Sequence, residues 1–148
     1  MAFIAEKDPG LIPQILSLIL DECINGITLA DPDLEDMPIV YANKAFETVT
    51  GYSQEEVIGR NCRFLQGEDR NQEEIKRIKE AINAQKPVEV VLRNYKKNGE
   101  LFYNRFKIIP LCDRNGKLIY FLGVQYDITR QIVDEETINK LNKELESL

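Results

Sequence analysis

The 148-residue sequence contains no histidine and no tryptophan. Without histidine it lacks the usual base that activates serine or cysteine nucleophiles, and also the commonest ligand of transition metals. No apolar run approaches the roughly 20 residues of a membrane-spanning helix, and the first residues do not read as a secretory leader. The net charge of −6 disfavours a protein that binds phosphate backbones. We therefore expect neither a nucleic acid nor a membrane as a direct partner.

Cysteine is scarce as well. Cys23, Cys62 and Cys112 are odd in number, far apart and without CxxC or zinc-site spacing. This usage predicts free thiols in a reducing, cytoplasmic environment. A thiol with an ordinary pKa of about 8.5 and no histidine beside it stays largely protonated at neutral pH. Chemistry at any of these cysteines therefore requires a trigger from elsewhere.

The order of predicted elements indicates a single α+β domain. We expect a five-stranded antiparallel sheet with helices on one face and with flanking N- and C-terminal helices. The predicted helices cover 11–20 and 44–50, a turn that ends at 59, and a segment from 71; the predicted strands cover 27–30, 39–42, 88–95, 101–109 and 117–126. Predicted helix caps are Asn43, Gly51, the Ser53/Glu56 capping box, and Asn71 with Glu74.

The chain divides into a helical cap over 1–24, a core over 25–128 and a C-terminal helix over 129–148. Apolar residues of the last segment follow a 3-4-3 spacing: Ile138, Leu141, Leu145 and Leu148. This pattern fits a coiled-coil seam between two chains and, equally well, one amphipathic helix lying on its own sheet.

Carboxamides lie on the apolar faces of three predicted strands. By strand alternation, Asn94 shares a face with Leu92, Asn104 with Phe106, and Gln125 with Phe121. A single buried amide is usually a satisfied core residue, but three on neighbouring strands suggest a shared polar ligand in an apolar pocket. The expected apolar walls are Ile27, Leu65, Phe106, Ile108 and Phe121.

Hairpin register decides whether these amides converge. A three-residue loop at Lys97–Gly99, with Gly99 left-handed, places Asn94 and Asn104 on one face. A two- or four-residue loop around 115–116 would bring Gln125 to the same face. We expect both arrangements.

The segment Gly59–Gly67, GRNCRFLQG, resembles the GxNCRFLQ signature of LOV (light-oxygen-voltage) photoreceptors, a branch of the PAS superfamily. The resemblance runs from about residue 25 to 128 and includes NY at 94–95, FYN at 102–104 and GVQ at 123–125. It is similar to short bacterial LOV proteins in particular. The resemblance implies a flavin chromophore, FMN, with riboflavin or FAD as alternatives.

The same resemblance implies roles for individual residues. Cys62 matches the cysteine that attacks flavin C4a, and Gln125 matches the glutamine beside flavin N5. Arg63 matches a phosphate-binding arginine, and Arg70 is similar to an extra phosphate-side arginine. Lys79 stands where a second phosphate arginine is usual, which removes the bidentate geometry and keeps the charge. The remaining matches are the ring-contacting amides Asn61, Gln66, Asn94 and Asn104.

The implied function is blue-light sensing without enzymatic turnover. Light drives a reversible Cys62–flavin C4a adduct, which alters the packing of the terminal helix or the geometry of a homodimer formed through the terminal helices. The downstream effector is open, as is the choice between a stand-alone protein and a fragment of a larger one. A PAS-type dimerisation module without a chromophore is the alternative from another class.

Overall fold

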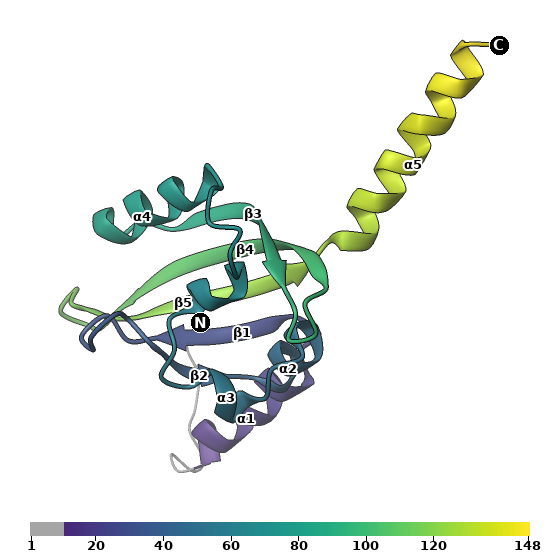
Figure 1. Ribbon diagram of the computed structural model, residues 1–148. Helices are drawn as coiled ribbons and strands as arrows, with labels where there is room; N and C mark the ends of the chain where they lie inside the picture. The colour runs from purple at the N-terminus through teal and green to yellow at the C-terminus, as the bar shows by residue number, and fades with distance from the viewer. Residues whose placement is uncertain (1–10) are drawn as a thin grey trace.

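The structure, a computed structural model, describes residues 11–148, so residues 1–10 of the predicted cap lie outside the described part. Its centre is a five-stranded antiparallel sheet in the order β2-β1-β5-β4-β3. Helices cover one face of this curved sheet (Figure 1). The α+β prediction with five antiparallel strands is confirmed. The strands are β1 (Gly26–Ala30), β2 (Ile39–Ala42), β3 (Val88–Tyr95), β4 (Leu101–Cys112) and β5 (Leu118–Asp127).

The helices between β2 and β3 begin and end largely as their cap residues predict. Asn43 begins α2 by accepting a hydrogen bond from the Phe46 amide at 3.2 Å, Gly51 ends the same helix with φ 78°, and the Ser53/Glu56 capping box begins α3. The helical elements are α1 (Leu11–Glu22), α2 (Lys44–Thr50), α3 (Gln54–Val57), the 3-10 helix η1 (Cys62–Gln66), α4 (Glu74–Ala84) and α5 (Thr129–Glu146).

The predicted start of α4 is wrong. Its N-cap position is Glu73, without a side-chain cap bond, rather than Asn71. The neighbouring Gln72 explains the shift, because its carboxamide binds the backbone of β3: Oε1 accepts from the Arg93 amide at 2.8 Å and Nε2 donates to the Arg93 carbonyl at 3.0 Å. A tertiary contact therefore fixes this segment in place of a local cap.

The β3–β4 hairpin has the predicted register. Lys96 pairs with Glu100 around the loop Lys97–Gly99, and Gly99 is left-handed with φ 87°. Leu92 then lies opposite Asn104, and Asn94 opposite Phe102. Even positions face even positions, so both asparagines point to the same side of the sheet.

The β4–β5 hairpin reaches the predicted face by a different route. Its loop has three residues, Arg114–Gly116, closed by a backbone bond from the Asp113 amide to Lys117 O at 2.8 Å, so the prediction of an even-length loop is wrong. A register shift beside Cys112 and Leu118 leaves one extra residue in β5 and restores the parity. Gln125 consequently lies opposite Phe106, on the inner face.

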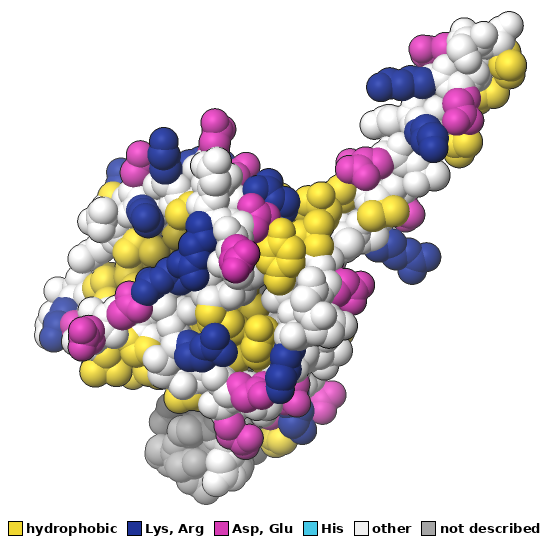
Figure 2. Space-filling view, viewed as in Figure 1, with side chains coloured by type: hydrophobic (Ala, Val, Ile, Leu, Met, Phe, Trp, Pro, Cys, Tyr) yellow, Lys and Arg dark blue, Asp and Glu magenta, His cyan; other side chains and the backbone are white. Residues whose placement is uncertain are grey.

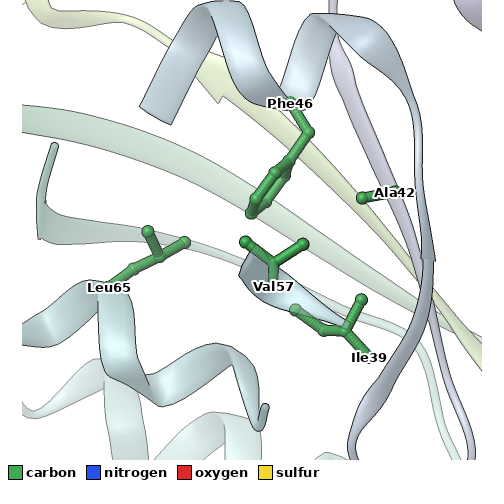
Figure 3. Close-up of a cluster of buried hydrophobic side chains, with 5 residues drawn as sticks. All are labelled: Ile39, Ala42, Phe46, Val57 and Leu65. Atoms are coloured by element: carbon green, nitrogen blue, oxygen red, sulfur yellow. The ribbon is translucent and has the colours of Figure 1, made fainter. Parts of the chain in front are cut away.

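A tightly filled apolar cluster joins β2 to the helices beside it. Phe46 and Val57 are fully buried and Ile39 is 1 % exposed. Figure 3 shows these side chains converging with Ala42 and Leu65. Because Leu65 belongs to η1, this cluster anchors the element that carries Cys62.

None of the residues of helix α5 is buried. It projects away from the sheet, with apolar side chains along its exposed surface (Figures 1 and 2). The prediction of a helix over 129–148 is confirmed in outline, whereas the alternative in which it lies on its own sheet is not the arrangement seen. No helix in residues 11–148 is both long enough and apolar enough to cross a membrane.

Candidate functional site

A cavity of about 220 Å³ lies between η1, α4 and the inner face of the sheet. Its polar lining consists of one thiol, five carboxamides and three cations, and the rest is apolar. The lining residues are Met37, Asn61, Cys62, Arg63, Leu65, Gln66, Arg70, Ile75, Ile78, Lys79, Ile82, Leu92, Asn94, Asn104, Phe106 and Gln125.

Two of the inner-face carboxamides leave polar atoms without a partner. Asn94 Nδ2 donates to the Arg93 carbonyl at 3.0 Å, and Asn94 Oδ1 accepts from Asn104 Nδ2 at 2.9 Å. Asn104 Oδ1 and both polar atoms of Gln125 are buried and make no hydrogen bond within the described residues. Buried polar atoms without partners cost free energy, commonly about 1–3 kcal/mol each. Their presence in one cavity indicates a ligand edge with both donors and acceptors.

Close backbone approach makes room for the Gln125 side chain. A Cβ on Gly123 would lie 2.5 Å from Thr28 Oγ1 and 3.0 Å from Phe106 Cε1. A Cβ on Gly26 would lie 3.1 Å from Gln125 Oε1. Glycine at these two positions therefore lets the inner face hold a large amide and an aromatic ring together.

Cys62 is the first residue of η1. Its side chain packs against the apolar cluster around Phe46 and against a second apolar cluster, which includes Phe106 and Ile108. Burial raises the pKa of this thiol to about 11, and the nearby Arg63 charge only partly opposes the shift. The thiol is therefore protonated at neutral pH. Cys62 carries a proton to donate but is a poor spontaneous nucleophile.

Residues around η1 hold Cys62 in place. The Asn61 carboxamide caps η1 by accepting from the Arg63 amide at 3.0 Å, and it donates to the Asp36 carbonyl at 2.7 Å. The Arg60 guanidinium lies 4.0 Å from the centre of the Phe64 ring, a cation–π contact. These contacts hold the backbone on both sides of Cys62.

Three cations line the cavity, each in a different environment. Arg63 pairs with the Asp36 carboxylate, which raises the pKa of the guanidinium. Arg70 donates Nε to the Gly67 carbonyl at 3.0 Å. For Lys79 no ion pair is found within residues 11–148.

A second ion pair fixes the segment between η1 and α4. Arg93 donates to both oxygens of Asp69, at 2.7 and 2.9 Å, and Tyr95 OH donates to the same carboxylate at 2.7 Å. These bonds lower the pKa of Asp69 to about 2. The Asp69 carboxylate therefore stays charged throughout the physiological pH range, and its bonds to Arg93 and Tyr95 hold the loop that carries Arg70 against β3.

The structure brings eleven of the fourteen predicted site residues to the cavity and leaves out Ile27, Ile108 and Phe121. Ile108 and Phe121 are buried in the apolar cluster that continues from the cavity wall. The prediction for Ile27 is wrong: Ile27 pairs with Val124, so it lies on the opposite face of the sheet from Gln125. Thr28, 4 % exposed, takes the inner position instead.

Sequence reasoning did not assign five of the lining residues to the site: Met37, Ile75, Ile78, Ile82 and Leu92. The three isoleucines recur at helical spacing on one face of α4, and Leu92 alternates with Asn94 along β3, so the pattern did place them toward the core. Met37 gives no such signal, because it lies in a turn with a left-handed backbone, φ 46°.

Comparison with known proteins identifies the family. A model of the PAS domain matches residues 24–130. A solved structure described as "Flavin Analogue Sheds Light on Light-Oxygen-Voltage Domain Mechanism" is 33% identical, with a TM-score of 0.71, and the match covers 92% of this chain and 97% of that one. The chain is a light-oxygen-voltage (LOV) domain of the PAS family. The resemblance carried by residues 59–67 is thereby confirmed.

Other similar proteins carry the LOV domain within longer chains. A "Blue-light photoreceptor" of Listeria innocua is 42% identical over 83% of this chain and 48% of its own length. A "Blue-light-activated histidine kinase" of Brucella canis is 44% identical over 81% of this chain and 24% of its own. The structure described as "Structure of an RNA-binding Light-Oxygen-Voltage Receptor" has a TM-score of 0.85 at 33% identity, over 99% of this chain and 41% of that one. The chain spans about half or less of these three.

Proposed function

We propose that this LOV domain senses blue light with a flavin held in the cavity, and that FMN is the flavin. The observation that carries the proposal is that the Cys62 thiol and the uncommitted carboxamide atoms of Asn104 and Gln125 line one cavity. Buried amide atoms that have no partner among residues 11–148 cost stability and do not contribute to it. A ligand with a polar edge and a reactive carbon gives both the amides and the thiol a role.

The lining suits a flavin in three respects. Carboxamides match a ring edge on which carbonyls and N–H groups alternate. Leu92, Phe106 and the isoleucines of α4 supply apolar walls for a flat ring. Arg63, Arg70 and Lys79 supply positive charge for a phosphate, which favours FMN over riboflavin.

When bound and excited by blue light, a flavin supplies a base at N5 and an electrophilic carbon at C4a. Cys62, which lines the cavity and keeps its proton, would supply the proton for that base and the sulfur for that carbon. The high pKa of Cys62 suits this order of events, because the thiol keeps its proton until light creates the base. The missing histidine is therefore no obstacle.

Gln125 connects the cavity to α5. Since neither polar atom of its carboxamide has a partner among residues 11–148, the side chain can present oxygen or nitrogen as the ligand edge changes between acceptor and donor. Two residues further along β5, Asp127 accepts from the Thr129 amide at 3.0 Å, and Thr129 Oγ1 accepts from the Tyr103 amide at 2.9 Å. We propose that this junction passes the change at Gln125 to α5.

The output we propose is a change in how two copies of the chain pair through their terminal helices. Ile138, Leu141 and Leu145 of α5 are each more than half exposed. An isolated helix of 18 residues is marginally stable in water, so a second copy that covers this seam would stabilise it. We further propose that residues 1–24 and 129–148 flank a sensory core over 25–128. This core performs no enzymatic turnover. It works in the reducing cytoplasm, where Cys62 stays a thiol.

A light-minus-dark absorption spectrum of the purified protein tests the proposal. The protein should be yellow, bleach under blue light and recover in the dark. Cys62→Ala should keep the colour and lose all reversible bleaching, whereas the matched Cys112→Ala, which removes an exposed thiol, should behave like the unchanged protein. Bleaching that survives in Cys62→Ala would refute the role of this thiol. Protein that stays colourless after refolding with FMN would favour a PAS dimerisation module instead.

A further inference from the structure

The charged residues that line the cavity are all positive. Arg63, Arg70 and Lys79 line it, and none of the described aspartates or glutamates does. One carboxylate nevertheless reaches this group from outside the lining, because the Arg63 guanidinium makes an ion pair with Asp36. Arg63 and Asp36 are 45% and 56% exposed at their side chains, so water and solutes reach the pair.

The turn that presents Asp36 is held in a fixed conformation. Asp36 and Met37 are both left-handed, with φ 65° and 46°. The Met37 amide donates to the Leu34 carbonyl at 3.1 Å, and Asn61 Nδ2 donates to the Asp36 carbonyl at 2.7 Å. Consecutive left-handed residues other than glycine are uncommon and costly, so they persist only where neighbouring contacts impose them.

The turn therefore belongs to the rim of the cavity. Met37 lines the cavity, and Asn61, which anchors the turn, is the residue before Cys62. This backbone arrangement keeps the Asp36 carboxylate beside Arg63.

The other two cations make no such pair. Arg70 uses Nε on a neutral carbonyl, that of Gly67, which leaves its terminal nitrogens for an anion. No ion pair is found for Lys79 among the described residues. A phosphate that reaches all three cations would meet a competing carboxylate at Arg63 alone.

From this geometry we propose that Asp36 is a specificity-determining residue: it competes with the phosphate of a bound flavin for Arg63 and so weakens the preference for FMN over riboflavin. The inference rests on the proposed flavin function. An anion at Arg63 either displaces Asp36 or shares the guanidinium with it, and like charges at one cation repel. Riboflavin has no phosphate and does not meet this competition.

The test measures the dissociation constants of FMN and riboflavin for the full chain, stripped of flavin, by quenching of flavin fluorescence. Asp36→Asn removes the charge and keeps the shape, and asparagine tolerates φ 65°. We expect the preference for FMN to rise about two- to five-fold, the scale of an exposed ion pair, with riboflavin binding unchanged. Asp36→Gly, which also accommodates this backbone, should change the preference in the same direction.

Two controls separate competition from general charge. Glu35→Gln makes the same change of net charge in the same turn, on an exposed residue that makes no ion pair within residues 11–148, and should change the preference less. In an Arg63→Gln background, Asp36→Asn should have no further effect, because the contested cation is gone.

An unchanged preference in Asp36→Asn would overturn the inference, and so would a fall, which would mean that Asp36 orients Arg63 toward the phosphate. An equal effect of Glu35→Gln would overturn it as well. These outcomes leave the flavin function standing. Failure of the unchanged chain to bind either flavin would instead remove the proposed function, and this inference with it.

Discussion

The two apolar clusters of the domain differ in how completely they are filled. The cluster around Phe46 and Val57 is closed, with both side chains fully buried. The cluster around Phe106 borders the cavity and two amides with uncommitted atoms, and the helix that covers it, α4, has no buried residue. In the closed half, around Phe46, side chains are packed to full burial; in the hollow half, around Phe106, buried amide atoms without a partner among residues 11–148 lower the stability of the fold. Mutations in the two halves should therefore have different consequences.

Truncating the closed half should have the largest effect. Phe46→Ala leaves a cavity where the ring is fully buried, and should lower the free energy of unfolding by about 3–5 kcal/mol. Chemical denaturation of the flavin-free protein measures this. Val91→Ala, at a 39% exposed residue of β3, is the control and should change stability by less than about 1 kcal/mol. A loss below about 1 kcal/mol for Phe46→Ala would contradict the comparison.

In the hollow half, removing an amide should be harmless to the flavin-free fold. Gln125→Leu replaces a buried carboxamide that has no partner in the described part of the chain, so the free energy of unfolding should stay constant or rise by about 1–2 kcal/mol while flavin affinity falls. Asn94→Leu is the matched control: it breaks the 2.9 Å bond to Asn104 and should destabilise by about 1–3 kcal/mol. Equal destabilisation by both variants would show that Gln125 is satisfied after all.

The Cys62 thiol, which lines the cavity, allows a third test of this comparison that leaves the fold unchanged. In flavin-free protein with Cys23→Ser and Cys112→Ser, alkylation of Cys62 should accelerate about tenfold per pH unit until the pH approaches about 11, since only the thiolate reacts. The sign follows from burial, which favours the neutral thiol and delays ionisation to higher pH. A plateau already near pH 8.5, the ordinary value for a thiol, would show that the cavity leaves Cys62 hydrated.

The sequence anticipates features that depend on nearby residues and on strand parity. Asn43, Gly51 and the Ser53/Glu56 pair cap their helices as predicted, and the Lys97–Gly99 loop sets the register that unites Asn94 with Asn104. These features are local, so short segments determine them. The site residues carried over from the LOV resemblance mostly reach the cavity for the same reason, because they lie on alternating strand positions or within η1.

Features that depend on distant partners escape this reasoning. Ile27 was assigned to the wall because it is apolar, but the outer face of β1 and β5 is also apolar, and pairing with Val124 places Ile27 there. Gln72 binds Arg93 and shifts the start of α4, although 21 positions separate the two residues. Asp36 and Arg63 are 27 positions apart, and no periodic pattern links them.

Helix α5 is long enough to act as a lever arm. Its 18 residues extend about 27 Å at about 1.5 Å per residue. A tilt of about 10° at Thr129 would sweep the far end through about 5 Å, close to the roughly 5.4 Å rise of one helical turn. If the proposed signal reaches α5, a rearrangement of one side chain in the core would be magnified into a displacement large enough to exchange the contacts between two paired helices.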